Sequence, residues 1–224
     1  MKKIMVTMLC SLCFISGCFA LTGCSGGDET FAQKEYTADA AQIGEIRIDV
    51  RDRQIDVSES EDGQIRITYS ENSRETYDIA VSDDNVLTMT NAGEKKWTDY
   101  IGGKPSAENR RISLQIPDAL TDGLTLSTTN EDISLSALSV AGSVSLSSNG
   151  GDITFEDLDA GEALDLTAKN GDISGTVVGS YDDFAIRSEI KKGECNLPEQ
   201  KEGGAKTLNV SGNNGDIDIE FVTE

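Results

Sequence analysis

The chain has 224 residues, of which 40 are acidic and 19 are basic, and its formal net charge is −21. A chain this acidic lacks the basic surface that phosphate binding needs, which argues against nucleic acid as a ligand and leaves cations or cationic surfaces as partners. The sequence contains no histidine, and this excludes the serine–histidine and cysteine–histidine catalytic systems.

Residues 1–23 have the layout of a secretory signal peptide, with two lysines, an apolar run and then small residues. The run is long enough to cross a bilayer, so a transmembrane segment is the alternative. We favour the signal peptide because LTGC, which ends at Cys24, resembles the lipobox of bacterial lipoproteins. The resemblance implies that this cysteine is diacylated on sulfur and becomes the first mature residue. ISGC, which ends at Cys18, also fits the pattern and is the alternative lipidation site.

The sequence predicts a lipidated cysteine and a flexible tether over residues 24–39, because SGGDET is polar and rich in glycine. One folded domain is expected over residues 40–224. These features predict an exported protein that a lipid holds at the extracytoplasmic face of the cell membrane. Cys195 is the only cysteine of the predicted domain, so it cannot form an internal disulfide.

The first half of the domain contains short runs of alternating apolar and polar residues, the pattern of strands with one buried face. No helix of useful length is visible after the signal peptide. The expected strands begin at Ile46 and Ile55, include Ile65 and Ile67, and cover residues 79–81, 86–89 and 112–116.

One long irregular segment, residues 91–111, interrupts these strands and holds the only tryptophan. It could be a contact surface, because aromatic and arginine side chains dominate binding hot spots. It could also fold over an open end of the sheet stack and prevent edge pairing, which is the interpretation we favour. We call it the cationic segment, after its basic and aromatic residues Lys95, Lys96, Trp97, Tyr100, Lys104, Arg110 and Arg111.

The second half repeats one four-residue phrase, which reads NEDI at 130–133, GGDI at 150–153, and NGDI at 170–173 and 214–217. The last interval, 44 residues between acids, is twice 22, which predicts a degenerate copy midway. KKGECNL lies there, with Glu194 in the place of aspartate and Cys195 in the place of isoleucine. A buried small apolar side chain is therefore the expected role of Cys195, rather than a reactive thiol. The repeated acids are Asp132, Asp152, Asp172, Glu194 and Asp216.

An apolar residue nine positions before each isoleucine of the phrase opens a second short strand, as Leu124 does for Ile133 and Leu164 for Ile173. The same turn in the same phase favours an all-β, parallel β-solenoid with coils of about 20–22 residues, which stack at about 4.8 Å. An antiparallel β-sandwich is the alternative. In a solenoid the phrase is the corner of each coil, since asparagine and glycine accept unusual backbone angles and aspartate accepts hydrogen bonds from amides.

Acids stacked at one corner would repel one another unless each is turned toward backbone amides or bridged by a cation. Calcium suits such an array, because it takes six to eight oxygen ligands. A turn-capping role for each carboxylate is the simpler interpretation, and no other cofactor is predicted.

The lipobox, the run IRIDVRDRQIDV, the strand ISLQIP and the NGDI turns together resemble the putative adhesin family of bacterial cell-envelope proteins, over residues 40–224. The resemblance implies a solenoid-like β fold, an envelope location and no assigned catalytic residues. We therefore expect a non-catalytic, adhesin-like binding module whose partner is a cell-wall polymer or an envelope protein. The alternative is a regulatory or sensing partner of a membrane protein in an envelope-stress response. A surface glycan-active enzyme with paired carboxylates is a distant third.

Overall fold

The structure is a computed structural model that describes residues 30–92, 104–118 and 122–223, and these residues form strands joined by turns and three-residue 3-10 helices. The 3-10 helices are η1 (Ala40–Gln42), η3 (Glu108–Arg110) and η4 (Tyr181–Asp183). The strands of the first half are β1 (Ala32–Asp39), β2 (Glu45–Asp49), β3 (Gln54–Glu59), β4 (Gln64–Glu71), β5 (Thr76–Val81), β6 (Val86–Ala92) and β7 (Arg111–Ile116). Those of the second half are β8 (Gly123–Thr128), β9 (Ile133–Leu135), β10 (Leu138–Val140), β11 (Ser143–Ser148), β12 (Ile153–Ala160), β13 (Ala163–Asn170), β14 (Ile173–Val178), β15 (Phe184–Ile190), β16 (Gln200–Lys201), β17 (Lys206–Asn214) and β18 (Ile217–Val222).

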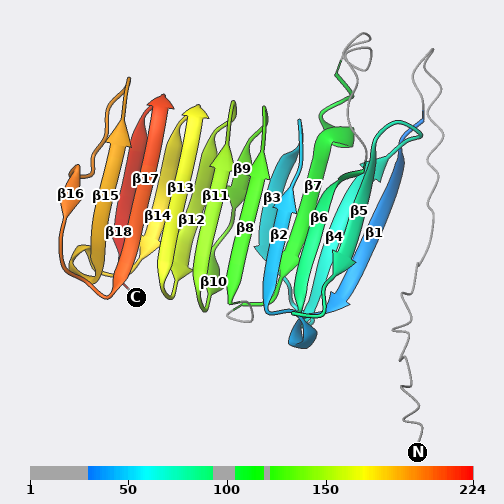
Figure 1. Ribbon diagram of the computed structural model, residues 1–224, viewed down its shortest axis with the longest axis horizontal. Helices are drawn as coiled ribbons and strands as arrows, with labels where there is room; N and C mark the ends of the chain where they lie inside the picture. The colour runs from blue at the N-terminus through cyan, green and yellow to red at the C-terminus, as the bar shows by residue number, and fades with distance from the viewer. Residues whose placement is uncertain (1–29, 93–103, 119–121, 224) are drawn as a thin grey trace, which may run out of the picture.

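Two sheets lie face to face along the whole domain (Figure 1). Sheet A has the order β1-β4-β7-β3-β9-β12-β14-β18, with β10 beside β12, and sheet B has the order β16-β15-β17-β13-β11-β8-β2-β6-β5. Each repeat places one strand in sheet B and the next in sheet A, and equivalent strands of neighbouring repeats pair in parallel. This confirms the predicted parallel β-solenoid, and the antiparallel sandwich is wrong.

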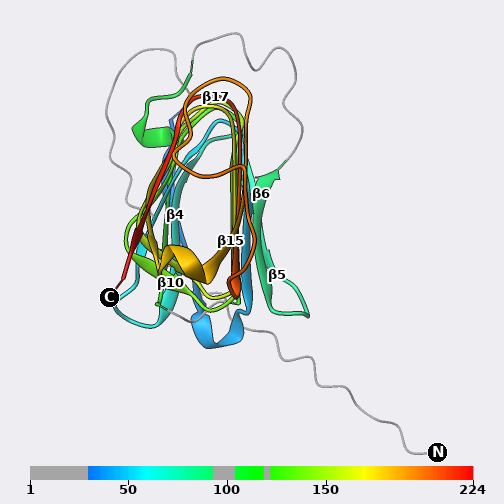
Figure 2. The same cartoon turned by 90° about the vertical axis from the view of Figure 1, so that its left-hand side faces the viewer.

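The core fills the space between the two sheets, which form two walls when the molecule is viewed along the stack (Figure 2). Alternation along each strand turns every second side chain inward. The innermost row of sheet B runs through the strands in register, and its members Ile46, Leu124, Val144, Leu164 and Leu208 are all fully buried. Each such side chain contributes about 1.5–3 kcal/mol when it leaves water. Stacking therefore supplies the stability that a domain with one cysteine cannot draw from disulfides.

The last two coils stack in an order that differs from their order in the chain. Strand β17 lies between β13 and β15, and β18 lies next to β14. The coil that contains β15 and Cys195 is therefore the terminal one, and Cys195 forms a parallel bridge with Ile217. The sequence placed the degenerate copy between the copies at Asp172 and Asp216. The structure corrects that order, because the chain after Cys195 folds back through β16 and then enters β17 between β13 and β15.

The amino-terminal end departs from the regular repeat. Strands β1, β4 and β7 pair antiparallel in sheet A, and β5 pairs antiparallel with β6 in sheet B. Residues 32–39, which the sequence assigns to a flexible tether, form β1 along the full length of β4. The folded domain thus begins before residue 40, because backbone pairing with β4 orders a segment whose side chains are largely exposed.

Within the described ranges, the structure has no helix whose length and apolarity would allow it to span a membrane. The apolar run at residues 4–23 and both lipidation candidates, Cys18 and Cys24, lie outside those ranges. Their roles remain predictions.

Candidate functional site: the acidic corner

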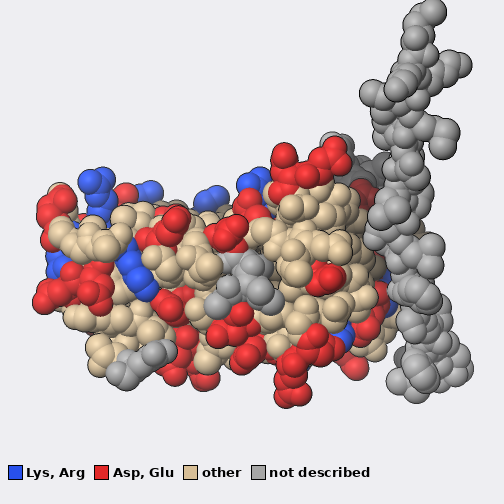
Figure 3. Space-filling model, turned by 90° about the horizontal axis from the view of Figure 1, so that it is seen from below, with Lys and Arg blue, Asp and Glu red and all other residues tan. Residues whose placement is uncertain are grey.

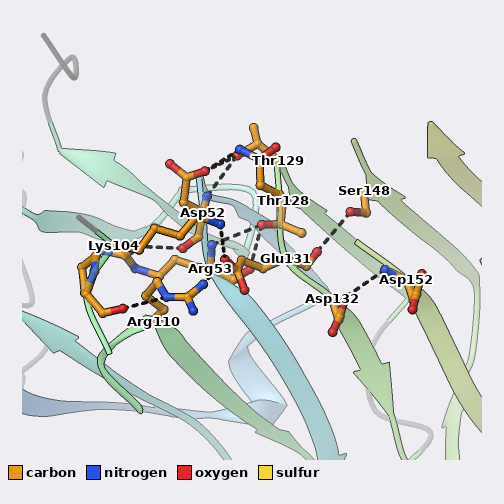
Figure 4. Close-up of polar contacts among 12 residues, drawn as sticks. Asp52, Arg53, Lys104, Arg110, Thr128, Thr129, Glu131, Asp132, Ser148 and Asp152 are labelled. Atoms are coloured by element: carbon orange, nitrogen blue, oxygen red, sulfur yellow. Dashed lines mark hydrogen bonds and ion pairs between the residues drawn. The ribbon is translucent and has the colours of Figure 1, made fainter. Parts of the chain in front are cut away.

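The repeated acids form a ladder along one edge of the solenoid, and each aspartate carboxylate accepts a hydrogen bond from the next coil. The amide of Asp152 donates to Oδ1 of Asp132 at 2.9 Å (Figure 4). The amides of Asp172, Asp216 and Glu194 donate in the same way to Asp152, Asp172 and Asp216, each at 2.8 Å. The stacking order is therefore Asp132, Asp152, Asp172, Asp216 and Glu194. The carboxylates cap turns, as the simpler interpretation expects, but each of the four aspartates caps the neighbouring turn and not its own.

A second hydrogen bond runs back across every step of the ladder. The amide of Ile133 donates to the carbonyl oxygen of Asp152 at 2.9 Å, and that of Ile217 donates to the carbonyl oxygen of Glu194 at 2.8 Å. Each corner thus satisfies one amide through a side chain and one through the backbone, without regular strand pairing. Aspartate recurs because its side chain makes the first of these bonds, whereas isoleucine recurs because its side chain is buried in the core.

The glycine of the phrase is required because the corners approach one another closely. A Cβ atom on Gly171 would lie 2.3 Å from the carbonyl oxygen of Gly151, and one on Gly215 would lie 2.2 Å from that of Gly171. No side chain fits at such distances without moving the backbone of the adjacent coil. The coil of β8 and β9 carries Glu131 at this position, and its carboxylate pairs with Arg110 and Lys104.

Buried hydroxyl groups complete the inner side of the corner. Ser148, which is fully buried, donates to the carbonyl oxygen of Glu131 at 3.1 Å and accepts a hydrogen bond from the amide of Gly151 at 2.9 Å. Thr128 donates to the carbonyl oxygen of Arg53 at 2.7 Å one coil earlier. These hydroxyls satisfy corner groups that have left the sheet ladder, as buried polar groups must be satisfied.

The ladder gives no converging ligand set for a cation. In the part of the chain that the structure describes, no three acidic or cysteine side chains group together so as to hold a metal ion. One oxygen of each of the four aspartates is taken by an amide, which favours the capping interpretation. The calcium hypothesis stays a prediction, and thermal melting in millimolar calcium and in chelator tests it.

The repeat geometry has a counterpart among known proteins, since residues 43–223 match the Toastrack DUF4097 family. The chain belongs to this family. Among solved structures it is similar to a putative cell adhesion protein from Clostridium sporogenes, with 14% identity and a TM-score of 0.59, over 86% of this chain and 100% of that one. A putative adhesin from Parabacteroides merdae is 14% identical with a TM-score of 0.35, over 88% of this chain and 97% of that one. Identities this low describe the fold alone, and no curated protein matches.

In this Toastrack domain, the described part of the cationic segment lies against the acidic corner. Arg110 and Lys104 both pair with the carboxylate of Glu131, Lys104 at 3.2 Å, and Arg110 also donates to the carbonyl oxygen of Pro105 at 3.0 Å (Figure 4). Arg111 pairs with Asp56 at 2.8 Å. These cations therefore fasten the segment to the first coils.

Four members of the predicted contact surface, Lys95, Lys96, Trp97 and Tyr100, lie outside the described residues. Both interpretations of the segment, contact surface and end cover, thus stay open. The described part of the segment contacts the corner, at the side of the stack. The outermost described strands at the amino-terminal end are β1 and β5.

No pattern in the sequence predicts the buried charged cluster at the amino-terminal end of the Toastrack domain. Arg53, 1% exposed, donates to the hydroxyl of Tyr77 and to the carboxylate of Glu75, and so ties the edge strand β5 to the corner before β3. Burial lowers the pKa of Arg53, but Tyr77 and Glu75 outweigh this and leave it above its usual value. Burial also raises the pKa of Tyr77, which Arg53 offsets only in part. The turn between β4 and β5 and the pairing of β5 with β6 place Glu75 and Tyr77.

Cys195 is half-buried and packs against the edge of the core. Its thiol lies 3.7 Å from the carbonyl oxygen of Leu197, to which it donates a weak hydrogen bond. The isoleucine position is thus kept, as predicted, but the side chain is less buried than expected because its coil is the last in the stack.

Proposed function

We propose that this chain is a lipid-anchored envelope protein whose solenoid is a non-catalytic, adhesin-like binding module. The observation that carries the proposal is that the repeated acids are engaged in stacking the coils. What the domain then presents outward is two broad faces of polar strand residues on a rigid frame. Such a frame suits recognition of an extended partner better than it suits bond-breaking chemistry, for which the sequence also offers no histidine.

The anchor is supported by the sequence LTGC and by the position of the first strand. Only seven residues separate Cys24 from Ala32, where β1 begins. A chain of that length spans at most about 25–30 Å when fully extended. Lipidation at Cys24 would therefore hold the amino-terminal end of the stack close to the membrane and direct the carboxy-terminal coils away from it.

The charge of the surface limits the class of partner. Acidic side chains are spread over the face that is seen from below, opposite the ladder (Figure 3). On this edge Glu59, Asp118, Asp157 and Asp159 surround a cavity of about 500 Å³. A polyanion would be repelled by such a surface, whereas a neutral polymer or a cationic protein surface would not.

The name of the Clostridium sporogenes protein refers to cell adhesion, and we carry that role to this chain as a proposal. An adhesin-like role requires retention by material outside the cell. A regulatory role in envelope stress would instead require one specific membrane-protein partner.

Affinity capture with the full chain in detergent separates these roles. The chain is offered to purified cell-wall sacculi and, separately, to solubilised membrane proteins from the same organism. We expect saturable retention on sacculi. Retention of a single membrane protein with none on sacculi would replace the adhesin-like role by the regulatory one.

A further inference from the structure

A second candidate site lies on the outer face of sheet B at its carboxy-terminal end. There a cavity of about 400 Å³ lies over β13, β17 and β15, and the segment that carries β16 forms one wall. The volume falls within the range of ordinary ligand pockets. We call this cavity the sheet B groove; the residues that line it and carry the argument are Asp165, Thr167, Arg187, Glu189, Glu199 and Asn209.

The groove exists because the final coil inserts before the terminal one. Insertion of β17 makes β15 the outermost long strand, and β16 then folds back against it in antiparallel pairing. The wall is held by Ser188, whose amide donates to the carbonyl oxygen of Glu199 at 3.1 Å and whose hydroxyl donates to that of Pro198 at 3.0 Å. A flat sheet face thereby becomes a concave one.

The floor of the groove is a grid of polar side chains in strict register. Asp165, Asn209 and Arg187 are neighbours across three strands, and Thr167, Ser211 and Glu189 form the parallel row two residues further on. Successive strands repeat at about 4.8 Å. A ligand that lies across the strands therefore meets a new pair of polar groups at each strand.

Some polar groups of this grid have no hydrogen-bond or ion-pair partner among the described residues. The amide nitrogen of Asn209 donates to Oδ1 of Asp165 at 2.7 Å, which leaves the amide oxygen of Asn209 without a hydrogen-bond partner among the described residues. Arg187 is exposed and forms no ion pair with any residue that the structure describes. The floor thus presents guanidinium donors, carboxylate and amide acceptors, and hydroxyl groups that serve as both.

This chemistry selects against most ligand classes. The inward side chains of Leu166 and Val210 are buried, so the groove offers little apolar surface to a hydrophobic ligand or an amphipathic peptide. Three carboxylates face one cation, which disfavours an anion. Strands β13 and β17 are paired on both sides, so strand addition at the floor is not possible.

We propose that the sheet B groove binds an uncharged oligosaccharide. A sugar ring presents adjacent hydroxyl groups that donate and accept at once, and planar carboxylate, amide and guanidinium groups bind such pairs in a bidentate manner. Arg187 and Asn209 are the principal contacts, and Asp165 positions Asn209. The inference rests on the proposed function and supplies the polymer chemistry for it.

The test is isothermal titration calorimetry of the full chain in detergent with the N-acetylglucosamine trisaccharide, maltotriose, cellotriose and, as an acidic comparison, trigalacturonate. We expect saturable binding of at least one uncharged trisaccharide. Arg187→Ala and Asn209→Ala should each weaken it about tenfold or more, as expected for a lost charge-assisted or bidentate contact. Arg47→Ala is the matched control, because Arg47 lies in the same row of sheet B but pairs with Glu45, and it should change affinity less than about twofold.

Three results would each contradict sugar binding in the groove. They are no binding to any uncharged trisaccharide, binding of trigalacturonate alone, and equal weakening by Arg187→Ala and Arg47→Ala. If sacculi still retain the chain while these sugars do not bind, the proposal of sugar binding in the groove is wrong and the proposed function stands. If a trisaccharide binds through Arg187 but sacculi do not retain the chain, sugar binding in the groove is supported and the adhesin-like role is wrong.

Discussion

Single aspartates at the corner couple one coil to the next through a carboxylate that accepts a backbone amide. Their exposure to water limits what each bond contributes, because an amide that loses its partner can still be solvated. The same exposure weakens the repulsion between neighbouring carboxylates. Modest hydrogen-bond stabilisation and weak repulsion between the carboxylates together explain how an acid ladder persists at one corner in a chain with a net charge of −21.

Two replacements of Asp172 distinguish the effect of its hydrogen-bond acceptor from the effect of its negative charge. Asp172→Ala removes the acceptor for the amide of Asp216 and should lower the free energy of unfolding by about 0.5–1.5 kcal/mol. Asp172→Asn keeps an oxygen in the same place and should be at least as stable as the parent chain. Chemical denaturation measures both. Asp78→Ala, at an exposed position of β5 away from the ladder, is the control, and an equal loss there would contradict the assigned role.

Tyr77 makes stability depend on pH at the alkaline end. Burial raises its pKa above the ordinary value, so its contribution to stability is complete below about pH 10, the pKa of an unfolded tyrosine, and is lost as the pH rises through the folded value. We expect the free energy of unfolding to fall above about pH 10, and to fall less steeply in Tyr77→Phe. Denaturation at several pH values compares the slopes. Identical slopes would mean that Tyr77 does not ionise on unfolding in this range.

At the scale of elements, the corner explains what the sequence could predict. The phrase specifies a glycine where backbones nearly touch, an aspartate that reaches the next coil, and an isoleucine that enters the core. Because these demands are local and identical in every coil, the repeat length, the strand positions and the parallel stacking follow from the sequence alone.

Glycine substitutions test the close approach directly. Gly171→Ala would place a methyl group 2.3 Å from a backbone oxygen, and we expect it to lower the free energy of unfolding by about 2 kcal/mol or more. In a domain of this size each 1 kcal/mol corresponds to about 2–4 °C in the melting temperature. Gly212→Ala is the control, since its nearest neighbour would be Cδ1 of Ile217 at 3.5 Å, an ordinary contact. If both variants melt alike, the corner is looser than the structure shows.

Other features depend on long-range pairing that the pattern does not encode. Coils with the same phrase are interchangeable at the corner, so the coils of Glu194 and Asp216 could stack in either order. Only Gly203 and Gly204, both with positive φ in the connection to β17, hint that the chain leaves the stack there. The cluster around Arg53 and the order of β1 depend likewise on antiparallel partners that break the repeat.

The whole molecule depends on the inserted final coil. This insertion sets the order of the ladder, puts Cys195 at the end of the core and creates the sheet B groove. In the structure Asn209 is the direct neighbour of Asp165, and Arg187 lies one strand further away. If the coils stacked in chain order, Arg187 would be the neighbour of Asp165 instead.

Cysteine pairs distinguish the two orders most directly. In a Cys195→Ser background, Asp165→Cys with Asn209→Cys should form a disulfide on mild oxidation, because adjacent strands bring Cα atoms within the range of about 4.4–6.8 Å that a disulfide allows. Asp165→Cys with Arg187→Cys should not, since two strand spacings exceed that range. Mass spectrometry of the oxidised chains reads out the bond. A disulfide in the second pair and none in the first would contradict the inserted coil, and with it the groove that we propose as a binding site.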